Sequence, residues 1–464
     1  MVFILTSNEV RCGLEVHAQL NFLNTKLFCS CPISHDSEPN SHTCPICRGL
    51  PGTLPSVNGT AVELGLKLAK VLSMKPVSVL KFSRKHYDYP DLPKGFQITQ
   101  NLDGILGTNG FLPCGDLTIP IHQIQLEEDP AKLSYHNDEI MVDYNRCGTT
   151  LIELVTDPIF RNAEQIRAFL QQYRRLLIYL GISDTRKEGS FRADVNVSVG
   201  NHPRVEVKNV GSDSDIIDAF LYEISRQSSI REFDNLGMET RNWDSNNRKT
   251  EISRDKESSS DYKYIPEGNI PPIEIPQSIF ETITLDLLPW DLEKQISNEF
   301  TLSKEQLQFL LDNHKLLPFY RSCMNMESIS QTLRTRFFWQ EYLTWYNIKD
   351  TELSPEQVIR LESIDLLDIT SILKKLESEK LSNQEFKKIL KKYIIQGSSL
   401  KTVKELDSSD EYTHSVVEYL KITYPKHFSV HPLPNNKINY LVGLGVKYSK
   451  GKVNPKSLQE LLKK

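Results

Sequence analysis

Residues 192–199 read RADVNVSV, a strict alternation of polar and apolar side chains. Because successive side chains of a β-strand point to opposite faces, this run predicts a strand whose apolar face packs on a core. The other face then carries Asp194 and Asn196. Both residue types are poor strand formers, and two of them in register favour the surface of a site over plain solvent exposure. Glu206 and Lys208 repeat the pattern on a second expected strand.

Two further expected strands carry ionisable side chains. Glu15 and His17 stand two residues apart in a strand over residues 14–20, so both side chains point to the same face. A lone histidine is usually a satisfied core residue, but the carboxylate beside it favours a metal or proton-transfer site. Glu153 lies inside the apolar run 151–155, where a buried carboxylate is costly unless it is paired or bound to a metal.

Three helices are predicted in the same half of the chain. Thr60 and Glu63 have the spacing of a capping box and predict the start of the first helix. Asn162 is expected to cap a second helix, which Gly181 stops. A third helix is expected over residues 213–227.

The chain changes character near residue 286. Residues 1–285 are expected to form a mixed α/β domain, so the fold class is α+β. Helical patterns rich in Leu, Lys, Glu and Gln then predict an all-α helical domain over 286–405. A Ser/Asp-rich stretch, 406–411, marks the start of a small helical tail domain over 406–464. The last 24 residues carry six lysines and one acid, which favours nucleic-acid binding or, equally, a solvated helix face.

The composition narrows the classes of protein further. The 464 residues are 39% hydrophobic and 25% charged, as in ordinary folded proteins. No apolar run approaches the roughly 18 residues of a membrane-spanning helix, so no membrane partner is expected. The formal net charge of −5 excludes a global cationic field for nucleic acid, although a local basic patch remains compatible with one. The Walker A pattern is absent from the sequence.

Four of the eight cysteines fall within 19 residues, as a C-x-C pair followed by a C-x-x-C pair. These four are Cys29, Cys31, Cys44 and Cys47. Paired thiolates on two short loops suit a tetrahedral zinc ion, and no open coordination position is evident, so we expect a structural zinc knuckle over 29–47. A redox-active pair and plain reduced thiols are the alternatives.

Two polar segments are the remaining candidates for functional sites. The acidic run 127–129 is either a solvated turn or part of a hard-oxygen site for magnesium. Residues 84–97 interleave basic and aromatic side chains around two prolines. Such a segment either stacks on a nucleic-acid end or forms a rigid loop whose aromatic rings pack on the core.

Together these segments resemble one family, the B subunit of aspartyl/glutamyl-tRNA amidotransferase. The resemblance spans nearly the whole chain and rests on many motifs in order. The motifs are residues 13–17, the four cysteines with 51–52, 84–100, 127–129, 143–146, 153, 188–190, 192–198, 207–209, 239–241, 261–264, 441–443, 450–452 and 455.

The resemblance implies a cradle-shaped catalytic domain followed by a helical domain and a tail that contacts tRNA. It also implies a reaction on glutamate that is wrongly attached to the glutamine tRNA. ATP with magnesium phosphorylates the side-chain carboxylate, and ammonia then displaces phosphate. The ammonia is freed from glutamine by a separate amidase (glutaminase) subunit, and a small third subunit completes the complex.

The family's functional residues carry over to matching positions in this chain. The implied magnesium ligands are His17, Glu128 and Glu153, with Glu15 and Glu127 supporting or joining them. Four residues are implied to line the site and stabilise developing charge: Asn145, Arg146, Asp194 and Lys208. Lys85 and Arg192 are expected to bind ATP.

Some positions depart from the family pattern. Pro130 follows the acidic run where Ala is usual, Ala131 stands in place of Gly, and Thr150 replaces a usual Pro. A catalytically silent, zinc-stabilised RNA-binding scaffold is one alternative. Amidation of Asp-tRNA(Asn) and an independent ligase that uses free ammonia are two others. The first ten residues show no arginine-rich transit peptide, yet the divergent helical region favours the mitochondrial matrix over a bacterial cytoplasm.

Overall fold

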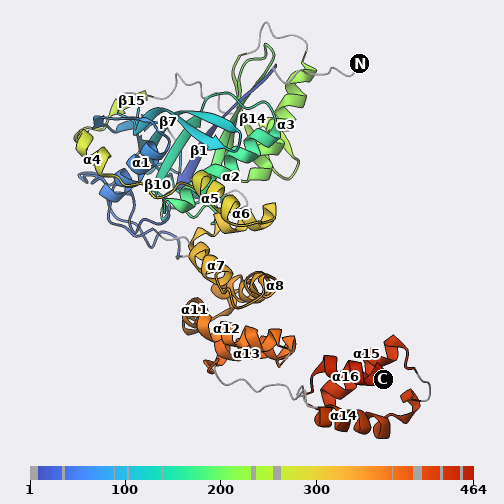
Figure 1. Ribbon diagram of the computed structural model, residues 1–464. Helices are drawn as coiled ribbons and strands as arrows, with labels where there is room; N and C mark the ends of the chain where they lie inside the picture. The colour runs from blue at the N-terminus through green and yellow to red at the C-terminus, as the bar shows by residue number, and fades with distance from the viewer. Residues whose placement is uncertain are drawn as a thin grey trace. The chain divides into compact units, whose positions relative to one another are not determined.

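The computed structural model describes residues 9–33, 37–87, 89–101, 104–136, 139–230, 237–253, 263–378, 380–400, 410–428, 432–449 and 453–463. The chain divides into two compact units, Met1–Asp312 and Asn313–Lys464 (Figure 1). Motif residues 261–262 and 450–452, and residues 406–409 of the expected boundary, lie outside the described residues.

A nine-stranded sheet is the framework of the first unit, as far as its described residues show. The strand order is β14-β13-β12-β11-β1-β10-β7-β6-β2, and every neighbouring pair is antiparallel except β12 with β13. The bounds are β1 Val10–Gln19, β2 Lys75–Pro76, β6 Gly107–Cys114, β7 Leu117–Glu128, β10 Thr150–Thr156, β11 Phe191–Val199, β12 Val205–Val210, β13 Glu239–Asp244 and β14 Lys249–Ile252.

The alternating runs form the strands that their pattern predicts. Val195 and Val197 of β11 and Val205 and Val207 of β12 are fully buried in the main hydrophobic core. Helices α1 (Gly59–Val71), α2 (Ala163–Tyr179) and α3 (Asp213–Ser229) contribute to the same core and pack on this face of the sheet (Figure 1). The predicted polar face of β11 and β12 is therefore turned away from these three helices.

The helix ends follow the sequence signals with one exception. Asn162 caps α2, and Gly181 with its left-handed backbone (φ +69°) follows the helix end, as predicted. The capping box predicted at Thr60 is wrong, because Asn58 caps α1 by accepting a backbone N–H of the first turn. The amide of Asn58 also donates to Thr25 Oγ1 at 3.0 Å. The cap of α1 therefore lies two residues before the position that the capping-box spacing predicts.

Two smaller sheets and a hairpin border the main sheet. One sheet has the order β15-β4-β5, from Lys263–Pro266, Ser83–His86 and Phe96–Thr99. The segment 84–97 thus joins two paired strands, and the Arg84 guanidinium lies 4.4 Å from the centre of the Phe96 ring. The other pairs are β3 (Val79–Leu80) with β16 (Ile273–Glu274) and β8 (Lys132–His136) with β9 (Glu139–Asp143).

Helices α4 (Gln277–Thr282), α5 (Pro289–Glu299) and α6 (Lys304–Asp312) close the first unit. Trp290 at the start of α5 packs against the main core. Arg175 of α2 forms an ion pair with Asp312, with Nε and Oδ1 2.8 Å apart. Because of these contacts, the domain boundary that the sequence predicts near residue 285 lies inside the first unit.

In the second unit the described residues form helices and no strands, as the sequence predicts. The helices are η2 His314–Leu316, α7 Leu317–Met324, α8 Gln331–Arg336, η3 Phe337–Tyr342, α9 Leu343–Tyr346, α10 Lys349–Glu352, α11 Pro355–Glu362, α12 Leu366–Glu377, α13 Asn383–Gln396, α14 Asp410–Thr423, η4 Pro425–Phe428, α15 Asn435–Tyr448 and α16 Pro455–Lys463. Helices α14, α15 and α16 share a hydrophobic cluster of their own. Among the described residues, none of the helices is long and apolar enough to cross a membrane.

Candidate active site and four-cysteine site

Strand β1 brings the candidate residues together through its two antiparallel ladders. His17 lies directly opposite Glu153 of β10 on one side and Arg192 of β11 on the other. Glu15 lies opposite Asp194 in the same way. Alternate residues of these strands belong to the core, so all five side chains belong to the face of the sheet opposite the three helices. We call this the acidic face.

Three of its groups form a compact trio. His17 Nε2 lies 3.3 Å from Glu127 Oε1 and 3.7 Å from Glu153 Oε2. The three donor atoms all lie within 4.8 Å of one another. Gln125 Nε2 donates to Glu153 Oε2 at 2.8 Å, and Thr99 Oγ1 donates to Glu127 Oε2 at 3.4 Å. An imidazole and two carboxylates held in this way are a suitable donor set for a divalent cation.

A second group of carboxylates lies beside the trio. Glu15, Asp194 and Glu206 each offer an oxygen within 4.8 Å of the others. Asn196 Nδ2 donates to Glu15 Oε1 at 2.9 Å. A β-bulge opposite Asp194 gives Asn209 a left-handed backbone (φ +56°), and the Asn209 backbone N–H donates to Asp194 Oδ1 at 2.7 Å. The bulge therefore fixes the orientation of one carboxylate of the acidic face.

Three carboxyl groups of the acidic face, those of Glu153, Glu127 and Glu15, resist ionisation. Burial raises the pKa of Glu153 well above its ordinary value, and the charges of Glu127 and Glu15 raise it further. Burial also raises the pKa of Glu127. Burial and the charges of Asp194 and Glu206 raise the pKa of Glu15 to about 7. Carboxylates in this environment are stabilised by a cation, because a positive charge favours their ionised form.

Basic side chains surround the same face. Burial lowers the pKa of His17 well below its ordinary value, and the charges of Arg192, Lys85 and Lys208 act in the same direction. A neutral imidazole is the form that binds a metal. Lys85 belongs to β4, where it lies opposite Tyr264 of β15. Cationic side chains beside carboxylates suit an anionic ligand that is bound together with a metal ion.

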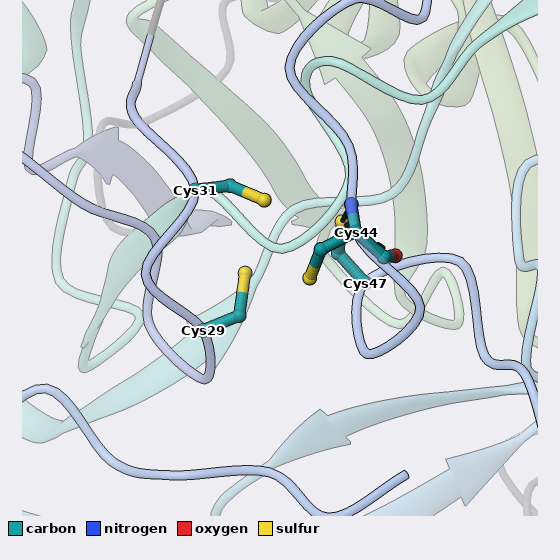
Figure 2. Close-up of side chains that lie close together, drawn as sticks. All are labelled: Cys29, Cys31, Cys44 and Cys47. Carbon is teal, nitrogen blue, oxygen red and sulfur yellow. Dashed lines mark hydrogen bonds between the residues drawn. The ribbon is translucent and has the colours of Figure 1, made fainter.

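The four cysteine side chains converge from two neighbouring loops (Figure 2). Their sulfurs all lie within 4.8 Å of one another. In a tetrahedral site with Zn–S bonds of about 2.3 Å, the sulfurs stand roughly 3.8 Å apart, so this cluster fits zinc. A hydrogen bond from Cys29 lowers the pKa of Cys47 to about 4. The cluster is thus consistent with the zinc knuckle expected from the spacing.

Two family models match this chain. A model described as the GatB/GatE catalytic domain matches residues 10–281, and a model described as the GatB domain matches residues 336–464. The first match alone covers more than half of the chain. The chain belongs to the GatB/GatE family.

Members of the GatB/GatE family resemble this chain along its full length. The B subunit of the aspartyl/glutamyl-tRNA(Asn/Gln) amidotransferase of Saccharolobus solfataricus is 34% identical over 474 residues, which cover 98% of this chain and 99% of that protein. The B subunit of the mitochondrial glutamyl-tRNA(Gln) amidotransferase of Candida tropicalis is 34% identical over 475 residues, which cover 97% of this chain and 96% of that protein. The resemblance to the B subunit of this ligase is therefore confirmed. Membership of the GatB/GatE family also implies the use of ATP.

Within this GatB/GatE catalytic domain, Glu128 does not join the trio. Its carboxylate Oε1 forms an ion pair with Lys94 and accepts the Ile98 backbone N–H at 2.8 Å. Consecutive residues of a strand point to opposite faces, so Glu127 and not Glu128 stands beside His17. The trio contains Glu127, which the resemblance implies as a supporting or joining residue, where the resemblance implies Glu128 as a ligand.

The side chains of Asn145 and Arg146 donate to or accept from backbone groups of nearby loops, and Arg146 Nε also lies 3.8 Å from Asp129 Oδ2. Asn145 Oδ1 accepts the His42 backbone N–H at 2.8 Å, and Asn145 Nδ2 donates to the Glu38 carbonyl at 2.8 Å. Arg146 Nε and Nη2 donate to the carbonyls of residues 130 and 131 at 2.9 and 2.7 Å. Arg146 thus holds the turn at residues 130–131, and Asn145 holds the loop of the four-cysteine site.

Three more side chains support this site, and Asp129 among them belongs to the candidate acidic run 127–129. Gln125 stands two residues before Glu127 on β7, a spacing that signals the same face. Asp129 is fully buried and accepts hydrogen bonds from Gln19 at 2.8 Å and Arg192 at 3.1 Å. Thr99 comes from a separate small sheet, and no pattern in the sequence places it beside Glu127.

Proposed function

We propose that this chain is the ligase subunit that activates the side chain of glutamate on misacylated Glu-tRNA(Gln) and converts it to the amide of Gln-tRNA(Gln). The observation that carries the proposal is the trio of His17, Glu127 and Glu153 beside the cationic groups of Lys85 and Arg192. Membership of the GatB/GatE family supports it.

The proposed reaction has two steps, because a carboxylate is a poor electrophile towards ammonia. In the first step, a carboxylate oxygen of the glutamate side chain attacks the γ-phosphorus of ATP and ADP leaves, which gives an acyl phosphate. In the second step, ammonia attacks the acyl carbon, the nitrogen loses a proton, and phosphate leaves. The products are the amide, ADP and inorganic phosphate.

The residues of the acidic face have separate parts in this proposal. His17, Glu127 and Glu153 hold a divalent metal, in place of the expected set with Glu128. A bound magnesium ion supplies neutralisation of charge on the phosphate oxygens. Lys85 and Arg192 bind the phosphate groups of ATP.

The second group of carboxylates lines the same reaction surface. Glu15 and Asp194 belong to it, and Glu206 extends it towards β12. Lys208, next to the bulge in β12, holds negative charge that develops on the leaving phosphate. Preorganised charged groups of this kind act on the transition state without having to reorient.

The remaining parts of the chain have proposed roles in a larger complex. Ammonia comes from an amidase (glutaminase) subunit, and a small third subunit stabilises the assembly. The four-cysteine site holds structural zinc. The division into a cradle domain (1–285), a helical domain (286–405) and a tail (406–464) remains our proposal, with the tail contacting tRNA. Lys447, Lys456 and Lys463 of the last two helices support that contact.

We propose the mitochondrial matrix as the compartment, with a bacterial cytoplasm as the alternative. The mitochondrial relative from Candida tropicalis supports the former, and the prokaryotic relatives support the latter. Fractionation of the source cells with an antibody to this chain distinguishes the two.

The test is conversion of Glu-tRNA(Gln) to Gln-tRNA(Gln) with Mg-ATP and glutamine, by this chain with and without an amidase subunit. We expect conversion only by the pair, and conversion by the chain with ammonium chloride in place of glutamine. Failure with both nitrogen sources contradicts glutamate amidation. Asp-tRNA(Asn) is then the next substrate to test, because the names of the prokaryotic relatives include it.

A further inference from the structure

Lys26 is a lysine with no exposed surface, which is unusual for a charged side chain. Its Nζ donates to the His42 carbonyl at 3.0 Å, to the Tyr144 carbonyl at 3.3 Å and to Cys47 Sγ at 3.6 Å. These three acceptors match the three N–H donors of an ammonium group. Among the described residues, no carboxylate forms an ion pair with Lys26, so the sulfur is its only acceptor that can carry a full negative charge.

The charge of the four-cysteine site explains a buried ammonium at this place. Four thiolates around one Zn²⁺ leave a net charge of about −2. A buried net charge is costly unless an opposite charge compensates it. Lys26 supplies one positive charge at Cys47, the sulfur that also accepts the Cys44 backbone N–H at 3.2 Å.

Lys26 also joins the cysteine loops to a second segment, residues 143–149, which we call the link turn. Besides the bond from Lys26 to the Tyr144 carbonyl, the Cys147 thiol donates to the Cys47 carbonyl at 3.3 Å. The Leu27 backbone N–H donates to the Gly148 carbonyl at 3.0 Å. The loop contacts of Asn145 add two more bonds. The link turn is thus bound to the cysteine site along most of its length.

The link turn passes tightly between the cysteine site and the end of β7. Gly148 has a left-handed backbone with φ +84°. A Cβ at Gly148 would stand 3.5 Å from the Lys26 side chain, 3.6 Å from that of Cys47 and 3.9 Å from Glu128 Oε2. The lysine stem, a zinc ligand and the last residue of β7 therefore converge on one glycine.

From the link turn the contacts continue to the acidic face. The Gly148 backbone N–H donates to the Asp129 carbonyl at 2.9 Å, and the Asp129 backbone N–H donates to the Thr149 carbonyl at 2.8 Å. The Asp129 carboxylate then binds Arg192, which lies opposite His17. Asp129 follows Glu127 by two residues. A shift of the link turn would therefore move Asp129, and with it both Glu127 of β7 and Arg192 beside His17.

We propose that Lys26 is the counter-charge of the four-cysteine metal site and couples occupancy of that site to the geometry of the acidic face through the link turn. Lys26 is a positioning residue in this scheme, because it acts through other groups. The coupling to the acidic face rests on the proposed function, whereas the role of Lys26 at the cysteine site does not.

The first test measures the zinc affinity of the full-length chain by competition with a coloured chelator. Replacement of a group that contacts a metal ligand usually weakens metal binding by about 10- to 100-fold, and we expect that loss for Lys26→Met. Lys26→Gln keeps a donor without the charge and is expected to lose nearly as much. An unchanged zinc affinity in both variants overturns the counter-charge role.

Lys70→Met is the matched control. Lys70 Nζ also donates to backbone carbonyls, at 2.8 Å to Phe280 and 2.7 Å to Ile283, but it contacts no cysteine. The zinc affinity of the Lys70→Met variant should equal that of the wild type. A similar loss in Lys70→Met would show that the effect in Lys26→Met is general destabilisation, which also overturns the proposal.

The second test uses the wild-type chain and needs no substitution. Hydrogen exchange is measured before and after zinc is removed with a chelator. We expect the amides of Gly148 and Asp129 to exchange roughly tenfold faster, or more, without zinc, because the link turn loses its anchor. Unchanged exchange at both amides overturns the coupling through the link turn.

The third test separates this inference from the proposed function. Mn²⁺ binding to the acidic face is followed by electron paramagnetic resonance in the zinc-loaded and zinc-free chains. We expect binding to weaken about 5-fold or more without zinc, a typical size for coupling between sites. Equal Mn²⁺ affinities overturn the coupling to the acidic face. If neither form binds Mn²⁺, the proposed metal trio is wrong, and the zinc affinities and exchange rates still decide the role of Lys26.

Discussion

The four-cysteine site and the acidic face gather their donor atoms in different ways. The cysteines belong to two loops that lie close together in the chain, so a short segment is enough to bring the four sulfurs together. The trio of His17, Glu127 and Glu153 comes from three neighbouring strands, of which β1 lies far from the other two in the sequence. Its geometry therefore depends on the register of the sheet. A one-residue change in register would turn the side chains of one strand to the other face and remove the acidic trio, whereas the cysteine cluster does not depend on strand pairing among its own four residues.

The largest effect is expected at the acidic face, where the register of β7 decides which carboxylate stands beside His17. Glu127→Gln should lower the rate of Glu-tRNA amidation by about 100-fold or more, because one of the three proposed ligands of the metal is lost. Glu128→Gln, on the opposite face of the same strand, should lower it far less. The rates are measured at saturating Mg-ATP and tRNA, with circular dichroism as the check on folding. Equal losses in the two variants would place both carboxylates at the reaction centre.

A smaller effect is expected at the cysteine site. Cys47→Ser should abolish zinc binding and lower the midpoint of thermal unfolding by about 5 °C or more, because a structural metal stabilises the fold around it. Atomic absorption measures the zinc content, and calorimetry measures the midpoint of thermal unfolding. Cys114→Ser, a buried thiol outside the cluster, is the control and should retain full zinc content. Loss of zinc without any change in the midpoint would mean that the loops hold together without the metal.

The smallest expected effect concerns the bulge in β12. Asn209 has a left-handed backbone, which costs a branched residue about 1–2 kcal/mol. Asn209→Val should therefore reduce stability by that amount and release Asp194, whereas Asn209→Gly should retain both the backbone and its N–H donor. Chemical denaturation and the rate of amidation are the measurements. An amidation rate that falls equally in both variants would assign the role to the asparagine side chain.

Sequence patterns predict those parts of the molecule whose contacts are local or periodic. The alternation in β11 predicts its apolar and polar faces, and the cysteine spacing predicts a cluster of four sulfurs. Asn162 is a correct cap because its hydrogen bond lies within the first turn of its helix. In each case the physical cause acts over a few residues.

Long-range contacts decide the features that the sequence does not predict. Glu127 and Glu128 are equivalent by residue type, and only the pairing of β7 with β10 shows which of them faces His17. Asn58, and not Thr60, caps α1, and its amide also donates to Thr25 in a loop of the same unit. The side-chain hydrogen bonds of Asn145, a residue that the resemblance implies for the site, go to a loop about a hundred positions earlier in the chain.

The position of β1 in the sheet has a consequence for the lifetime of the acidic face. It is the fifth of nine strands in the described sheet, so both of its edges are hydrogen-bonded and its amides open last when the fold fluctuates. His17 and Glu15 thus share the stability of the whole unit. A destabilising substitution elsewhere in the unit should lower the number of folded molecules in the cell, while each molecule that stays folded retains an intact reaction surface.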